Sequence, residues 1–149
     1  MKVTTIILNG VEVKLRLTAS GLAEYAESLG SGGNTLFAIL DALDDIQNQG
    51  KLFGSALTYK GHNNSVTDGF ELIDMLADAE YGPIEKKELI VQLAERSGVI
   101  GKVDAAKILA GIKSGNEKLY DTAVAILSGN TENLVAAQHE SADTEENPT

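Results

Sequence analysis

Apolar and other residues alternate on both sides of Asn9-Gly10 near the start of the chain. A period of two predicts β-strands, and Asn-Gly is a favoured pair for a two-residue type I′ turn. This turn fixes a register in which three pairs share one apolar face, namely Leu8 with Val11, Ile6 with Val13 and Thr4 with Leu15. The opposite face carries Val3, Thr5, Ile7, Glu12, Lys14 and Arg16. The sequence therefore predicts a β-hairpin with one face packed on the rest of the chain.

Apolar residues after the hairpin recur at the three- and four-residue spacing of amphipathic helices. The first predicted helix is capped by Thr18 or Ser20, ends at Gly30 and buries Leu22, Tyr25, Ala26 and Leu29. The second runs from a cap at Asn34 to about Gly50 and buries Leu36, Ile39, Leu40, Leu43 and Ile46. Residues 51–60 are apolar but ambiguous, and we expect a short helix weakened at Gly54, followed by a loop at 61–65.

Two further helices are predicted between residues 67 and 98. The first starts at Thr67 or Asp68, extends to Glu80 and buries Phe70, Ile73, Leu76 and Ala77. Pro83 suits a first helical position and opens the second, which ends at Gly98. The second helix buries Leu89, Ile90, Leu93 and Ala94.

Short helices between Gly and Asn residues are predicted after residue 100. Their apolar stripes are Ala105, Ile108, Leu109 and Ile112, then Tyr120, Ala123, Val124 and Leu127. The pattern Ile-x-Ser-Gly-Asn occurs at 112–116 and again at 126–130, which fits either a repeat or two coincidental helix caps. We expect an α+β fold with a hairpin and helical domain at 1–100, a short-helix extension at 101–138 and an acidic mobile tail at 139–149.

Composition narrows the functional classes. The net charge of −10 disfavours nucleic acid and anionic membranes as partners. The chain has no Cys, and no apolar run has the length of a membrane span. We therefore expect a cytoplasmic protein.

Few residues offer candidate chemistry. The two histidines, His62 and His139, lack partners at the spacing of a zinc site or a catalytic triad. Two acidic groups have helical spacing: Asp41, Asp44 and Asp45, then Asp74 and Asp78. Each group is compatible with a metal site, but the solvated face of an acidic amphipathic helix gives the same pattern. We predict no catalytic, cofactor or metal site, and hence a non-enzymatic protein.

The order of segments resembles a known family. The hairpin ILNGVEVKLRLT leads into LAEYAESLG, followed by TLFAILDALDDI, GFELIDMLADAEYG and KKELIVQLAERSGVI. Over residues 3–100 this order is similar to the tail assembly chaperones of non-contractile phages and prophages, especially those of Gram-positive hosts. The glycine-rich segment at 30–34, Gly54 and the region after Gly101 depart from that pattern.

The resemblance implies a non-enzymatic function in the host cytoplasm. Such chaperones bind the tape measure protein, help the tail tube protein to polymerise and are absent from the mature virion. Homo-oligomers are also compatible with the sequence. The candidate partner-binding residues are Val3, Ile7, Tyr120, Val124 and Leu127. The main alternative is a structural morphogenesis component such as a head–tail connector or adaptor; an enzyme with an unrecognised site and an acidic DNA mimic are the others.

Overall fold

The alternating segment at the start of the chain forms the predicted hairpin in the computed structural model, which describes residues 2–29, 35–60 and 62–114. Strand β1 (Thr4–Leu8) pairs antiparallel with β2 (Val11–Leu15) in the predicted register. At the turn, Asn9 has a φ of 50° and Gly10 a φ of 86°, as a type I′ turn requires.

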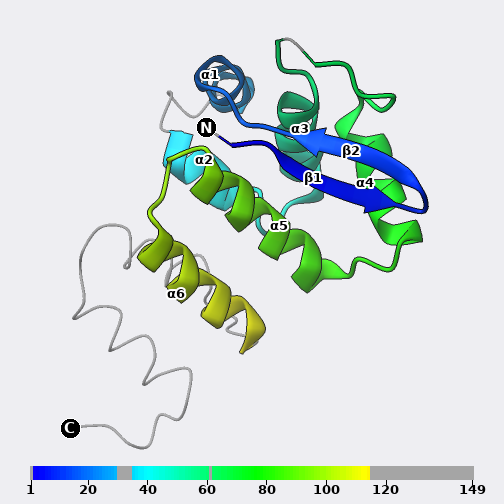
Figure 1. The fold of residues 1–149 in the computed structure, drawn as a ribbon. Helices are drawn as coiled ribbons and strands as arrows, with labels where there is room; N and C mark the ends of the chain where they lie inside the picture. Colours follow the sequence, from blue (N-terminus) through cyan, green and yellow to red (C-terminus); the bar gives the residue numbers. More distant parts are fainter. Residues whose placement is uncertain (1, 30–34, 61, 115–149) are drawn as a thin grey trace, which may run out of the picture.

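The two faces of the hairpin differ in burial as predicted, with two exceptions. Leu8, Val13 and Leu15 are at most 1% exposed, whereas Ile7 on the opposite face is 69% exposed. Both exceptions belong to the predicted apolar face: Ile6 is only partly buried, and Val11 is 37% exposed. Val11 lies directly beside the turn, where the hairpin extends to the end of the molecule (Figure 1).

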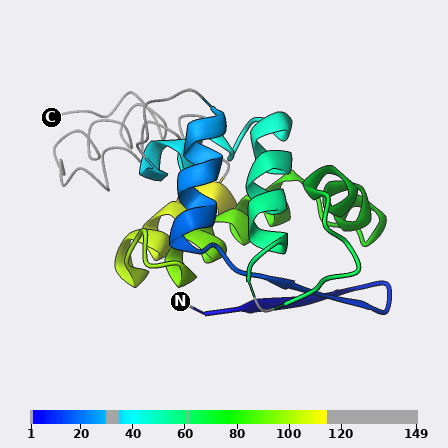
Figure 2. The same ribbon diagram turned by 90° about the horizontal axis from the view of Figure 1, so that it is seen from above.

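Six helices complete the α+β fold in the described residues. They are α1 (Ala19–Ser28), α2 (Thr35–Asp41), α3 (Ile46–Leu57), α4 (Gly69–Asp78), α5 (Pro83–Arg96) and α6 (Lys102–Lys113). Figure 2 shows the hairpin as a layer along one side, with α1 and α3 standing side by side against it and running in opposite directions. Helix α6 packs on α5. The hairpin thereby gains the helical support that an isolated two-stranded sheet lacks.

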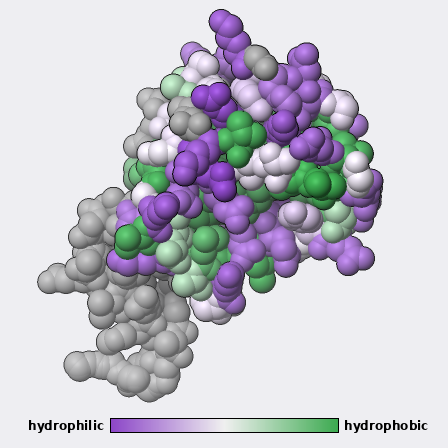
Figure 3. All heavy atoms as spheres, in the orientation of Figure 1, coloured by the Kyte–Doolittle hydropathy of each residue, from purple (hydrophilic) through white to green (hydrophobic). Residues whose placement is uncertain are grey.

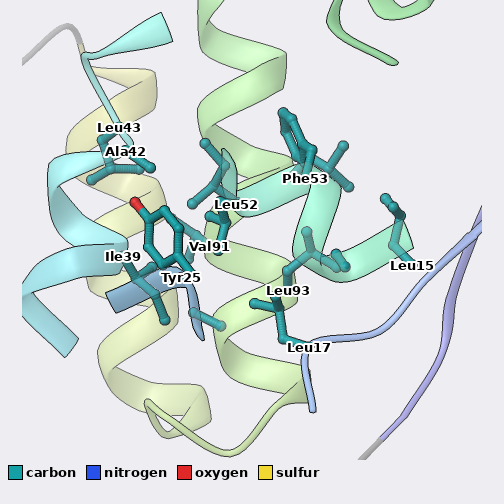
Figure 4. Packing of buried hydrophobic residues seen from close by; sticks show 14 of the residues in the cluster. Leu15, Leu17, Tyr25, Ile39, Ala42, Leu43, Leu52, Phe53, Val91 and Leu93 are labelled. Atoms are coloured by element: carbon teal, nitrogen blue, oxygen red, sulfur yellow. The ribbon is translucent and has the colours of Figure 1, made fainter. Parts of the chain in front are cut away.

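All eight elements contribute side chains to one hydrophobic core. The largest fully buried residues include Tyr25 and Phe53, and Figure 4 shows Tyr25 close to Ile39 and Ala42. The Tyr25 hydroxyl donates a hydrogen bond of 2.6 Å to the Ala38 carbonyl, so its polar end is satisfied inside the core. The predicted stripes of α1, α5 and α6 are largely confirmed, with Leu29 and Leu109 only partly buried.

The prediction of one helix from Asn34 to Gly50 is wrong, because α2 ends at Asp41 and a separate helix, α3, begins at Ile46. The Asp45 carboxylate accepts hydrogen bonds from the backbone N–H groups of Gln47 and Asn48, which fixes this second start. Ile46 is consequently 58% exposed and does not belong to the apolar stripe.

Helix α3 also continues through Gly50 and Gly54, where an end and a weak point were predicted. Close contact with α4 explains Gly50 in α3 and Gly69 in α4, whereas a Cβ on Gly54 would make only an ordinary contact. A Cβ atom on Gly50 would lie 2.4 Å from Cε1 of Phe70, and one on Gly69 would lie 1.8 Å from the Gly50 carbonyl oxygen. The glycines let the two backbones approach, which overrides their low helix propensity.

The buried face of α4 is rotated from the predicted one. Leu72, Ile73 and Leu76 are buried, whereas Phe70 is 47% exposed and Ala77 is exposed. Phe70 lies over Gly50 at the margin of the helix pair. The expected cap at Asn34 and the elements after residue 114 lie outside the described residues, and the division of the chain at residue 100 stays a prediction.

Candidate partner-binding surface

The two edges of the hairpin differ in hydrogen bonding. In the observed register, alternate residues of each strand turn their backbone N–H and C=O groups outward. On β2, Asn64 bonds both outward groups of Lys14: its Oδ1 accepts from the Lys14 N–H (3.0 Å) and its Nδ2 donates to the Lys14 C=O (2.9 Å). The Arg16 N–H donates to the Ala56 carbonyl at 2.9 Å. The chain itself therefore closes the β2 edge at Lys14 and Arg16, whereas no described residue bonds the outward backbone groups of Glu12 beside the turn.

The loop that carries Asn64 is held in place by its own contacts with α3 and the hairpin. The Asn64 Nδ2 also donates to the Leu57 carbonyl at 2.9 Å, where α3 ends. The His62 ring stacks on Tyr59 with centroids 5.3 Å apart, and the Arg16 guanidinium lies 5.9 Å from the Tyr59 ring centre. His62 thus has a packing role in the loop that closes the β2 edge.

The β1 edge is open at its centre. Its outward residues are Val3, Thr5 and Ile7, which lie on the exposed face of the hairpin. The Val3 carbonyl accepts a hydrogen bond from Nη1 of Arg96 (3.3 Å), and the Lys2 N–H donates to the Arg96 carbonyl (3.3 Å). No described residue bonds the outward backbone groups of Thr5 or Ile7. An open edge of this kind can accept another strand.

The structure brings two predicted partner-binding residues, Val3 and Ile7, to this open edge. Val3 is 37% exposed and Ile7 69% exposed. In Figure 3, hydrophobic atoms form separate areas between hydrophilic residues on this side of the molecule. The other three predicted residues, Tyr120, Val124 and Leu127, lie outside the described residues. Partner binding by all five stays a prediction.

A pocket of about 420 Å³ lies at the N-terminal end of the β1 edge. Its lining residues are Lys2, Glu95, Arg96, Ile100, Gly101 and Lys102. Three of them are basic and one is acidic, in a chain whose net charge is −10. None of the three basic side chains forms an ion pair with a described residue. This cluster could not be predicted from the sequence, because residues 2 and 96–102 are far apart along the chain.

The predicted acidic group at 41–45 does not share one helix face. Asp41 ends α2, Asp45 caps α3, and Asp44 pairs with Lys87 at 2.9 Å. Asp74 and Asp78 are both exposed on α4, where the predicted spacing is confirmed. Within 2–29, 35–60 and 62–114, no three His, Asp or Glu side chains gather in a way that would hold a metal ion.

Comparisons with family models, curated proteins and solved structures give no match to this chain. Among the described helices, none combines the length and the apolar character needed to cross a membrane. The candidate binding features of the described residues are the open β1 edge, its exposed apolar side chains and the basic pocket.

Proposed function

We propose that this protein is a non-enzymatic binding protein of the tail assembly chaperone type, whose client is a tape measure protein. The single observation that carries the binding role is the open β1 edge, on which Ile7 is 69% exposed beside unpaired backbone groups. The identity of the client rests on the resemblance of residues 3–100 to that chaperone family.

The two edges of the hairpin differ in their accessibility to a partner strand. Asn64 and the end of α3 cover the β2 edge at Lys14 and Arg16, whereas Thr5 and Ile7 on β1 are uncovered by described residues, so a partner strand has better access to β1. Proteins commonly protect an edge strand with charged residues, proline or a covering segment. The segment Thr4–Leu8 contains neither a charge nor proline. Its unprotected state therefore supports a role in binding.

The open edge also suits reversible binding. Backbone hydrogen bonds to an added strand give affinity with little dependence on sequence, while Val3 and Ile7 add apolar contacts. A chaperone must hold its client during assembly and release it afterwards. The edge is short, and among its described residues the backbone groups that have no partner are those of Thr5 and Ile7 and the N–H of Val3, so release has few bonds to break.

The test is co-expression with a tape measure protein encoded beside this gene. The full-length chain should keep that client soluble and co-purify with it, and Ile7→Asp should weaken the association. Ile46→Asp is the matched control, because Ile46 is 58% exposed at the start of α3 and lies away from the β1 edge. A Val124→Asp, Leu127→Asp double variant tests the second predicted contact region.

Two results would contradict the chaperone function. One is a client that is equally soluble without this protein. The other is the protein in stoichiometric amounts in mature particles, which would favour the structural alternative, a connector or adaptor.

A further inference from the structure

The open β1 edge and the basic pocket form one continuous surface. Arg96 joins them, because it lines the pocket and its Nη1 atom reaches the carbonyl of Val3, the first outward residue of the edge. Lys2 also lines the pocket and immediately precedes Val3. A strand added along β1 would therefore reach the pocket as soon as its ladder passes Thr5.

The position of the pocket determines the direction in which a bound segment runs along β1. The pocket lies at the N-terminal end of β1. A segment that pairs antiparallel with β1 has its C-terminal end at that point, and antiparallel pairs are slightly the more stable. The residues of the segment that follow the paired part then meet Arg96, Lys2 and Lys102.

Charge defines the chemistry of those residues. The side chains of Lys2, Arg96 and Lys102 form no ion pair with the described residues, and Glu95 is the one acidic residue in the lining. Helix α6 begins at Lys102, and its N-cap residue, Gly101, provides no side-chain cap. The helix N-terminus adds partial positive charge to the same pocket. Carboxylates are the complementary groups.

We propose that this surface binds an extended protein segment antiparallel to β1, with acidic side chains immediately C-terminal to the paired residues. The proposal rests on the proposed function and adds the chemical class of the bound segment. Thr5 and Ile7 supply the backbone bonds, and the basic pocket fixes direction. The net charge of −10 repels acidic segments elsewhere on the molecule, so the pocket also determines where such a segment binds.

The probe is a fluorescein-labelled, C-terminally amidated peptide of the order Thr-Val-Thr-Val-Thr-Glu-Glu, measured by fluorescence anisotropy with the full chain. A peptide of the reversed order keeps the composition and places both glutamates at the other end. The first peptide should bind at least about tenfold more tightly than the second, the scale of one or two charge-assisted hydrogen bonds. N-methylation of its central threonine should also weaken binding, because it removes one strand hydrogen bond.

Matched protein variants locate the site. Arg96→Gln combined with Lys102→Gln should weaken binding of the first peptide about tenfold and abolish the preference for its order. Lys107→Gln is the control, since Lys107 is an exposed residue of the same helix as Lys102 and does not line the pocket. Thermal melts that agree with wild type show that the variants fold.

Several outcomes would overturn the proposal. These are no saturable binding up to about 1 mM peptide, equal binding of both orders, or an equal effect of Lys107→Gln. The protein could also prove to be a dimer that Ile7→Asp dissociates. That result would show that a second copy of the chain, and not an acidic segment, occupies the β1 edge. If the pocket variants lose the peptide but still co-purify with the tape measure protein, the proposed function stands and the acidic segment is not its mode of binding.

Discussion

The side-chain amide of Asn64 bonds both backbone groups of Lys14, and so takes the position that a third strand would occupy beside β2. A third bond joins the same amide to the Leu57 carbonyl. One side chain thus joins the hairpin, the end of α3 and the loop after it. This arrangement decides which edge of the hairpin remains available.

Asn64→Ala should destabilise the protein by about 2–4 kcal/mol, because three hydrogen bonds are lost and half-buried backbone groups remain unpaired. Asn63→Ala is the control, since Asn63 is exposed and makes none of these bonds. Urea unfolding followed by circular dichroism measures both. Equal midpoints for the two variants would show that the amide does not hold the β2 edge closed.

The glycines between α3 and α4 give a second prediction. Gly69→Ala should unfold the protein or cost several kcal/mol, because its Cβ would overlap the Gly50 carbonyl oxygen. Gly50→Ala should cost less, since the obstacle there is the ring of Phe70, which is 47% exposed and has room to move.

Gly54→Ala, in the same helix as Gly50, should stabilise the protein, in contrast to the other two glycine variants. Its nearest atom, the Gly69 nitrogen, would lie 3.7 Å from the new Cβ, an ordinary contact. Alanine is about 1 kcal/mol more favourable than glycine in a helix, so this variant should melt at a higher temperature than wild type. Calorimetry of the three variants measures their melting temperatures, which should rise in the order Gly69→Ala, Gly50→Ala, Gly54→Ala. Destabilisation by Gly54→Ala would show that the helices approach more closely than the structure indicates.

Local pattern was enough to predict the hairpin. The alternation and the Asn9-Gly10 turn determine register and faces without reference to distant residues, and both agree with the structure. The prediction failed where distant segments meet. Gly50 looked like a helix end because its partner, Phe70, is 20 positions away in the chain.

The candidate surface likewise combines features that follow from local sequence with features that depend on distant segments. Val3 and Ile7 could be assigned to the outer hairpin face from alternation alone. The closed β2 edge depends on Asn64, fifty residues from Lys14, and the basic pocket joins Lys2 to Arg96. Neither contact has a local signature, so the sequence alone could not show which edge is closed or which groups close it.

Burial of the hairpin face gives a third prediction. Val13→Asp should cost several kcal/mol, because Val13 is 0% exposed and the substitution puts an unpaired charge in the core. Lys14→Asp places the same side chain on the opposite face and should be far milder, since the Asn64 bonds involve only the backbone of Lys14. Similar melting temperatures for the two variants would mean that the hairpin face is not buried in solution.

Tyr25 gives a prediction about pH. Burial, with a smaller contribution from the negative charges of Asp41 and Asp45, raises the pKa of the Tyr25 hydroxyl well above its ordinary value of about 10. The folded protein therefore keeps this proton at a pH where the unfolded chain loses it. Because the folded state then binds more protons, stability falls as pH rises above about 10, by up to about 1.4 kcal/mol per pH unit from this group.

Tyr25→Phe isolates that effect. The variant should be less stable near neutral pH by about 1–2 kcal/mol, because the buried Ala38 carbonyl loses its 2.6 Å hydrogen bond. Above pH 10 its stability should decline less steeply than that of wild type, so the two curves should converge. Tyr81→Phe is the control, because Tyr81 is only partly buried, and it should leave the wild-type slope unchanged. Parallel curves for wild type and Tyr25→Phe, measured by urea unfolding between about pH 8 and 11, would show that the Tyr25 hydroxyl titrates normally and is not held inside the core.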